Sequence, residues 1–340
     1  MTEQQTATIA GVFDRAAETY DQVGVDVFGP IADRLVREVE PRPGERALDI
    51  GCGRGAVLLR IAAAVGPGGA AHGLDLSPKM VAGALAAAAE AGAEVQAWVG
   101  DAQSPAVPST PYDLITSSLV LFFLPDPLAA LTSWRALLAA GGRIGVTTFG
   151  PYGDHWSAVD AVFEPYLPPA MRDARTTGRT GPFGSDEGVA GLLRDAGFSG
   201  MRTEHATVPV RFRDEDHWHT WSWSVGQRMM WDRIPEGERA TVRDQAFAAL
   251  QNCRDVAGVL GFDQVVRFTL AHNSATAPGP QLHASASLSY GSRRQRIFSV
   301  GRGCGSRRGG GGDRPGSRPV PGDRWCPVRP WDIVLLAWRT

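Results

Sequence analysis

The chain has 340 residues, of which 43% are hydrophobic and 21% charged, and its formal net charge at pH 7 is −2. Such a chain can bury a sizeable core, as one large or two small globular domains. The near-neutral balance argues against nucleic acid as a partner, and no apolar stretch is long enough to span a bilayer. Residues 1–10 carry no signal-peptide pattern, and the four cysteines show no metal-ligand spacing, so we expect a reduced, cytoplasmic protein without metal or disulfides.

Turn residues divide the first 150 residues into alternating helices and strands. Two helices with one apolar face are expected before the first strand, at residues 9–17 and 30–39. Strands are then expected at 46–50, 70–74, 95–99, 112–116 and 143–149. The helices between them are expected at 57–65, 78–91 and 127–139. Strands and helices that alternate at this spacing predict an α/β fold, with a parallel sheet and helices on both faces.

The rest of the chain is less regular. Residues 150–184 are rich in glycine, proline and aromatic residues, which predicts a long loop with some helix. Further helices are expected at 186–196, 216–232 and 236–252, and strands at 201–213 and 264–270. Residues 276–340 are basic and rich in glycine, arginine and proline without apolar periodicity, so we expect a disordered tail. A basic partner-binding tail is the alternative.

Residues 47–56, with the sequence ALDIGCGRGA, form the most informative segment. Apolar residues lead to an acid and three glycines, and an amphipathic run follows, which predicts a buried strand, a tight turn and the start of a helix. Glycine lets the backbone approach a ligand closely, and the helix N-terminus offers unpaired N–H groups to it. The alternative is a strand–turn–helix unit that needs glycine for its geometry alone.

Two nucleotide cofactors fit this turn. Gly51, Gly53 and Ala56 match the G-x-G-x-x-G/A pattern of a dinucleotide site. Asp49, two residues before Gly51, and Gly55 complete the pattern of an S-adenosylmethionine site. The glycines alone therefore leave an NAD-type oxidoreductase and a methyltransferase open.

Acidic residues follow three consecutive strands. Asp49 lies at the end of the first strand, Asp75 ends the second, where carboxylates bind ribose hydroxyls, and Asp101 follows the third. A carboxylate at Asp101 can accept a hydrogen bond from the exocyclic amine of an adenine that lies across the strand ends. Each acid alone is more often a helix cap or a turn residue. Together with the glycine turn, they favour S-adenosylmethionine.

Several further motifs point the same way. They are LDIGCGRG at 48–55, GLDLS at 73–77, GDA at 100–102, YDLI at 112–115, PL at 127–128 and GGR at 141–143. In these motifs the chain resembles the class I S-adenosylmethionine-dependent methyltransferases, in particular the methyltransferase type 11 enzymes of ubiquinone and menaquinone biosynthesis. Upstream, Thr19-Tyr20-Asp21 resembles the N-terminal segment of that branch, which folds over the cofactor. The resemblance covers about residues 9–150, and residues 151–270 are loosely similar to the variable lid of actinomycete small-molecule methyltransferases.

The resemblance implies a fold and domain boundaries. The implied fold is Rossmann-like, with a seven-stranded, mostly parallel sheet in which an antiparallel last strand at 264–270 pairs between the fifth and sixth strands. One methyltransferase domain would span residues 1–275. It would contain a cofactor half at 9–150 and a helical lid and substrate region at 151–260.

The resemblance also implies which residues bind S-adenosylmethionine. They are Tyr20, Asp49, Gly51, Gly53, Gly55, Asp75, Leu76, Met80, Asp101, Ala102 and Ser117. The acid and glycines at 49–55 would face the methionine end of the cofactor, and Asp75 the ribose. Leu76 and Met80 would pack on the face of the adenine, with Asp101 and its neighbour at the adenine edge. Ser117 would line the passage to the methyl group.

Methyl transfer from a sulfonium asks the protein mainly to align the two partners, because the donor is already activated. A base is needed only where the acceptor must lose a proton. His155, next to Asp154 after the fifth expected strand, is the catalytic candidate, and His217 and His219 are the alternatives.

Residues 217–223 form the densest aromatic cluster. Trp218 and Trp221 follow helical spacing, which predicts packing against the sheet domain. Trp223 and the nearby histidines are the alternative lining of an apolar acceptor pocket. We therefore expect methyl transfer to a small aromatic, quinone or polyketide-like metabolite by a monomer or homodimer. A non-catalytic cofactor-binding protein is the alternative of a different class.

Overall fold

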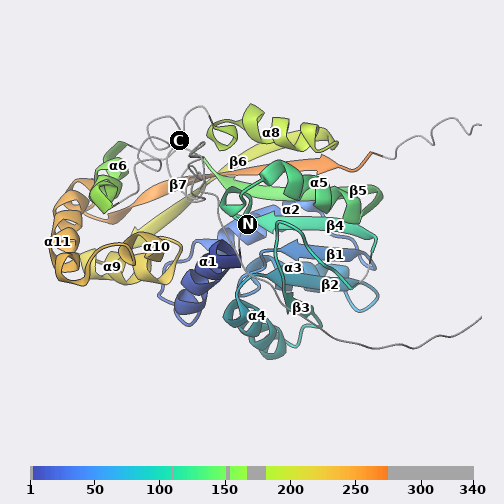
Figure 1. Cartoon of the computed structure of the whole chain (residues 1–340), viewed down its shortest axis with the longest axis horizontal. Coiled ribbons are helices and arrows are strands. Elements are labelled where there is room, and N and C mark those ends of the chain that lie inside the picture. The colour runs from blue at the N-terminus through green and yellow to red at the C-terminus, as the bar shows by residue number, and fades with distance from the viewer. Residues whose placement is uncertain (1–2, 109, 151–153, 167–180, 275–340) are drawn as a thin grey trace, which may run out of the picture. The chain divides into compact units, whose positions relative to one another are not determined.

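The computed structural model describes residues 3–108, 110–150, 154–166 and 181–274, and the tail expected at 276–340 lies outside the described residues. A seven-stranded sheet runs through the described chain in the order β3-β2-β1-β4-β5-β7-β6 (Figure 1). Its strands are β1 (Arg46–Ile50), β2 (Ala70–Asp75), β3 (Gln96–Val99), β4 (Tyr112–Ser118), β5 (Leu138–Phe149), β6 (Ser199–Phe212) and β7 (Leu260–His272). The first five strands pair in parallel, and β7 runs antiparallel between β5 and β6. The Rossmann-like sheet with an antiparallel last strand is therefore confirmed.

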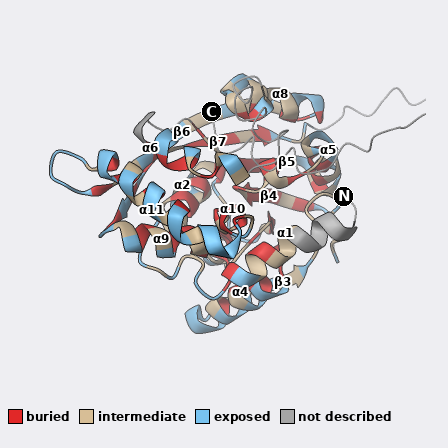
Figure 2. Cartoon of the chain, turned by 60° about the vertical axis from the view of Figure 1, so that its left-hand side comes forward, coloured by how far each residue is buried: buried red, intermediate tan, exposed pale blue. Residues whose placement is uncertain are grey.

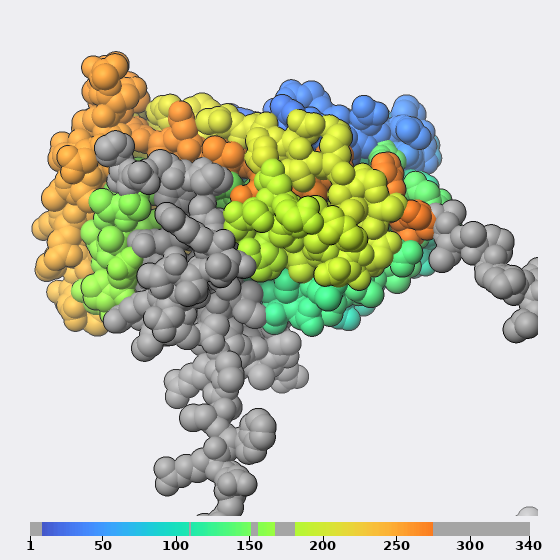
Figure 3. Space-filling view, turned by 90° about the horizontal axis from the view of Figure 1, so that it is seen from above, coloured from blue at the N-terminus to red at the C-terminus, as the bar shows by residue number. Residues whose placement is uncertain are grey.

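Helices flank this sheet on both faces. The chain passes from β1 through α3 (Ala56–Val65) to β2 on one side of β1, and from β4 through α5 (Pro127–Leu137) to β5 on the other. Because parallel crossovers are right-handed, these two helices lie on opposite faces. α2 (Phe28–Val39) packs against α3, and α8 (Asp186–Asp195) packs against α5 and over β6 and β7. Figure 3 shows the yellow-green surface of α8 over this part of the sheet.

Local signals explain where two of the helices begin. α4 (Pro78–Ala91) has proline in its first turn, and Ser77 Oγ accepts a hydrogen bond from the backbone N–H of Met80 at 3.1 Å. α5 begins in the same way, since Asp126 Oδ1 accepts from the N–H of Ala129 at 2.9 Å. A cap followed by proline is a strong local signal, and both helices begin where the sequence predicts.

Four helices beyond one end of β6 and β7 form the lid (Figure 1). They are α6 (Asp154–Ala161), α9 (Glu215–Ser224), α10 (Arg228–Trp231) and α11 (Arg239–Leu250). The rings of Phe163 and Trp231 lie 5.0 Å apart in its core, and Trp218 is fully buried beside Trp231. Each such ring contributes roughly 1.5–3 kcal/mol by its burial. Figure 2 shows the outer faces of these helices exposed and the strands buried. None of the described helices is both long enough and apolar enough to cross a membrane.

Several elements differ from the sequence-based prediction. α1 (Glu3–Ala16) begins at Glu3 instead of residue 9, and β7 extends over Leu260–His272 instead of 264–270. The helix expected at 216–232 is divided into α9 and α10, because Val225 between them has an extended backbone. The helix expected at 127–139 ends at Leu137, because Leu138 pairs with Tyr112 at the start of β5. β4 continues two residues beyond its expected end, which places Ser117 inside the strand.

Candidate functional site

A cavity opens where the order of the strands reverses, between β1 and β4. Open α/β sheets bind their ligands at such a point, outside the carboxyl ends of the strands. The empty volume of this cavity is about 1250 Å³, including its mouth. The segments that follow β1 to β5 line it, together with α1 (Glu3–Ala16), the lid and parts of β6 and β7. The cavity therefore lies between the sheet domain and the lid.

The glycine turn and Asp75 form one wall of the cavity. The two oxygens of Asp75 accept hydrogen bonds from the backbone N–H groups of Gly53 and Ser77, each at 2.9 Å. Gly51 and Gly53 have φ of +73° and +52°, in the left-handed region that favours glycine. A Cβ on Gly51 would lie 2.3 Å from Val120, whereas nothing lies within 4 Å of a Cβ on Gly53. The backbone at Gly53 is therefore open to a ligand.

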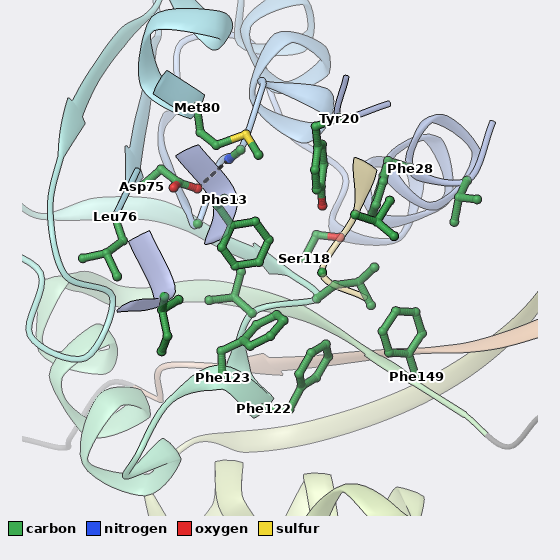
Figure 4. Close-up of a pocket in the computed structure, with 18 of the residues that line it drawn as sticks. Phe13, Tyr20, Phe28, Asp75, Leu76, Met80, Ser118, Phe122, Phe123 and Phe149 are labelled. Carbon is green, nitrogen blue, oxygen red and sulfur yellow. Dashed lines mark hydrogen bonds between the residues drawn. The ribbon is translucent and has the colours of Figure 1, made fainter. Parts of the chain in front are cut away.

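We call this part of the cavity the glycine end. Its lining residues are Gly51, Gly53, Asp75, Leu76, Met80, Asp101 and Ala102 (Figure 4). The loop after β3 is held in place, since the Ala102 carbonyl accepts from Trp134 Nε1 at 2.7 Å and Asp101 Oδ1 from the N–H of Gln103 at 2.8 Å. Burial raises the pKa of Asp75 above its ordinary value. A ligand that donates hydrogen bonds to Asp75 would oppose this shift, because donors stabilise the ionised carboxylate.

Aromatic residues cover the cavity. Tyr20 stacks on Phe28, with ring centroids 4.8 Å apart, and Phe13 from α1 meets Phe123 edge-on at 5.6 Å. Burial raises the pKa of Tyr20 well above its usual range, so its hydroxyl is protonated at neutral pH. The Tyr20 segment therefore lies over the cavity, as the resemblance implied.

Polar contacts hold α1 in this covering position. Arg15 Nη2 lies 2.5 Å from Asp232 Oδ2 at the end of α10, which joins α1 to the lid. Asp14 Oδ1 accepts a hydrogen bond from Ser77 Oγ at the start of α4. The helix is thus tied both to the lid and to the sheet domain.

The other part of the cavity, which we call the aromatic end, is apolar. It is lined mainly by Phe28, Phe122, Phe149, Val210, Trp221, Val225 and Phe262. The rings of Phe122 and Phe149 lie 5.4 Å apart (Figure 4). Ser118 and Gln264 add polar groups to this end. Among the described residues, no Lys, Arg or His lines the cavity.

Most residues that the sequence assigned to the cofactor lie together in this cavity. Tyr20 joins all seven residues of the glycine end. Ser117 does not line it, because its side chain is fully buried and Oγ donates to the carbonyl of Ile50 at 2.9 Å. Side chains alternate along a strand, so the neighbouring Ser118 faces the cavity instead. Ser118, instead of the expected Ser117, is therefore the serine that lines the cavity.

Asp49 and Gly55 lie behind the cavity wall. Asp49 is 2% exposed, and its Oδ1 accepts a hydrogen bond from Thr116 Oγ1 at 2.8 Å. Burial raises the pKa of Asp49 to about 7. Gly55 has a left-handed backbone conformation just before α3, and Leu59 fills the space where a Cβ on Gly55 would lie. Both residues support the turn from inside the protein.

The structure does not bring the histidine candidates into the described lining of the cavity. His155 belongs to the backbone of α6, and its side chain lies outside the described residues. The His217 ring contacts the Val23 carbonyl at 2.7 Å through Nε2, and His219 Nε2 accepts from Trp223 Nε1 at 3.1 Å. Neither ring lines the cavity, and Trp223 stacks on Trp231. Trp221 and Val225 line the aromatic end instead, so the alternative lining by Trp223 and the histidines was wrong.

Sequence reasoning missed most of the aromatic end. Phe149 ends a predicted strand, and that position alone could have identified it. Phe28, Phe122, Phe262 and Gln264 come from segments far apart in the sequence, and only the folded chain brings them together.

Comparisons with known proteins agree with the geometry. Residues 47–142 match a family model described as a methyltransferase domain. Nocamycin O-methyltransferase from Saccharothrix syringae is 39% identical over 245 residues, which cover 68% of this chain and 86% of that protein. Aklanonic acid methyltransferase DauC from Streptomyces sp. (strain C5) is 39% identical over 164 residues, or 48% of this chain and 74% of that protein.

Proposed function

We propose that this chain, which belongs to the class I S-adenosylmethionine-dependent methyltransferases, methylates a small molecule, and that this acceptor is an aromatic, quinone or polyketide-like metabolite. We propose further that the methyl group goes to an oxygen of this acceptor. Nocamycin O-methyltransferase, which this chain matches at 39% identity over 86% of that protein, is named for transfer to oxygen, and this supports oxygen as the acceptor atom.

The observation that carries the proposal is the continuity of the cavity. Its glycine end offers open backbone at Gly53 and a carboxylate at Asp75, the kinds of groups that nucleotide cofactors require. Its aromatic end offers rings and aliphatic side chains, which suit a flat apolar molecule. Displacement at a methyl group needs donor and acceptor in one enclosed space, and this cavity provides it.

The glycine end fits S-adenosylmethionine. Each oxygen of Asp75 accepts one backbone N–H, which leaves further lone pairs for the ribose hydroxyls. The open space above Gly53 accommodates the methionine portion. Leu76 and Met80 supply apolar contact for the adenine, and Asp101 is proposed to accept from its exocyclic amine.

S-adenosylmethionine supplies an activated methyl group on a sulfonium. The work of the chain is to hold the acceptor oxygen in line with that methyl group, and such positioning supplies about 7–11 kcal/mol of a reaction barrier. Phe13, Tyr20 and Phe28 cover the cavity and exclude water. His155, at the edge of the lid, stays the predicted proton acceptor for substrates that must be deprotonated.

Two measurements on the purified chain test this function. Calorimetry compares the binding of S-adenosylhomocysteine with that of NADH, and we expect only the first to bind. Incubation with S-adenosylmethionine carrying a labelled methyl group and an untargeted metabolite extract should then yield labelled apolar products. Binding of NADH alone would contradict the cofactor assignment, and labelled products that are all small and polar would contradict the acceptor class.

A further inference from the structure

Gln264 is a buried polar residue in the wall of the aromatic end. It lies on β7, between β5 and β6, and its side chain is 6% exposed. Its Nε2 donates hydrogen bonds to the carbonyls of Val265 at 2.7 Å and Gly150 at 3.2 Å. Both amide hydrogens are therefore used, and these bonds fix which atom of the amide is the oxygen.

The oxygen of this amide has no hydrogen-bond partner among the described residues. Phe149, Val210 and Phe262 line the same end of the cavity, and their side chains offer no hydrogen-bond donor. Gln264 itself lines the cavity, so this oxygen is accessible from it and keeps its lone pairs for a ligand. The carbonyl oxygen of Gln264 is therefore an acceptor that a ligand in the aromatic end can satisfy.

The lining of the aromatic end restricts the ligand further. Its rings and aliphatic side chains offer apolar contact, and Ser118 adds a second polar group. A ring compound suits this end, and a hydroxyl or N–H group on that compound can donate to the Gln264 oxygen and so keep a hydrogen bond when it leaves water.

We propose that Gln264 Oε1 accepts a hydrogen bond from a hydroxyl or N–H group of the methyl acceptor, and so selects ring compounds that carry such a donor. This inference rests on the proposed function and names the polar group that the acceptor must have.

The test measures the ratio of two affinities, by equilibrium dialysis on the full chain. The probes are 2-naphthol and naphthalene, which differ by one hydroxyl. The chain is saturated with S-adenosylhomocysteine, and the dialysis is repeated without it, so that the ratio is measured whether or not the cofactor product binds. Gln264→Met keeps the length of the side chain and removes the acceptor. Phe262→Leu, on the same strand, is the matched control that alters the apolar wall only.

We expect the 2-naphthol to naphthalene affinity ratio to fall about fivefold in Gln264→Met, the effect of one neutral hydrogen bond. Phe262→Leu should weaken both probes and keep the ratio. A purely structural role for Gln264 would weaken both probes equally, and an unchanged ratio would overturn the inference. If Gln264→Met does not fold, Gln264→Asn, which withdraws the amide by one methylene, should lower the ratio in the same way.

One further result would count against the inference. Failure of the wild-type chain to bind either neutral probe would overturn it. Failure of S-adenosylhomocysteine to bind concerns the proposed function, and calorimetry detects it separately from the probe ratio.

Discussion

At the scale of single residues, Asp75 combines two roles that the sequence does not separate. Its position after β2 predicted contact with ribose hydroxyls alone. The structure adds a role within the protein, because its carboxylate holds the N–H of Gly53 in the glycine turn and that of Ser77 before α4. Asp75 therefore lines the cavity and also holds the neighbouring glycine turn in its conformation.

Asp75→Ala should lower both cofactor affinity and stability. We expect S-adenosylhomocysteine to bind about 10- to 100-fold more weakly, because hydrogen bonds to a charged group contribute about 1.5–3 kcal/mol. The matched control is Ser185→Ala, which removes the cap that accepts from the N–H of Gly188 at the start of α8 and should cost about 1 kcal/mol of stability without affecting binding. Calorimetry and thermal unfolding give both quantities. Unchanged affinity in Asp75→Ala would make the residue purely structural.

The buried carboxyl of Asp49 predicts a pH dependence of stability. Burial raises its pKa to about 7 in the folded chain, against about 3.9 in an unfolded one. Between these values the folded state holds a proton that the unfolded state has released, so this group's contribution to stability falls as pH rises from about 4 to 7. Asn resembles the neutral form and still accepts from Thr116.

Asp49→Asn should therefore match the wild type in stability at pH 4 and exceed it at pH 8, by about 1–3 kcal/mol. Urea unfolding at the two pH values, without ligand, measures the difference. A variant that is less stable than the wild type at pH 8 would show that the ionised carboxylate stabilises the fold, and the assigned shift would be wrong.

At the scale of elements, the sequence predicts best where local signals are strong. The bounds of β1 and α4 agree with the prediction, because a glycine turn and a cap followed by proline mark them. The lid was predicted less well. The apolar period of 216–232 continues across a break at Val225 that depends on packing within the lid, and periodicity contains no information about such a break.

The same contrast between local signals and tertiary packing explains which residues of the site could be predicted. The glycine end is built from residues directly after strands, which strand positions identify. The aromatic end combines residues from β5, β6, β7 and the lid, and which face of each element meets the cavity depends on tertiary packing. β4 ends two residues later than predicted, which was enough to exchange Ser117 for Ser118.

The covering helix α1 gives a prediction at this scale. Phe13→Ala removes ring contacts with Tyr20 at 6.3 Å and with Phe123 at 5.6 Å, which opens the cover over the glycine end. We expect S-adenosylhomocysteine to dissociate about tenfold faster in stopped-flow measurements, since aromatic pairs contribute about 0.5–1.5 kcal/mol beyond burial. Phe247→Ala, which removes a ring contact with Trp218 inside the lid, should lower the melting temperature and leave dissociation unchanged. Equal dissociation rates in both variants would show that α1 does not retain the ligand.

At the scale of the whole molecule, the domain boundary stays a prediction. The sheet is complete at His272, where β7 ends, and the basic residues after 275 lie outside the described residues. We propose that residues 1–275 form the methyltransferase domain and that the tail contributes neither to its core nor to its site.

A chain truncated after Pro278 should keep the melting temperature and the affinity of the full chain for S-adenosylhomocysteine. Attraction between the basic tail and an otherwise acidic chain is expected to be weak, because salt screens exposed charges beyond about 10 Å. Thermal unfolding and calorimetry on both forms check this. An insoluble truncated chain, or one that no longer binds, would place the boundary further along the sequence.

The central claim is that one cavity holds the methyl donor at its glycine end and the acceptor at its aromatic end. A crystal structure of the chain with S-adenosylhomocysteine tests it most directly. The account predicts the ribose hydroxyls on Asp75, the adenine against Leu76 and Met80, and the sulfur directed toward Ser118 and the aromatic end. A ligand bound elsewhere, or one whose sulfur points away from the aromatic end, would contradict it.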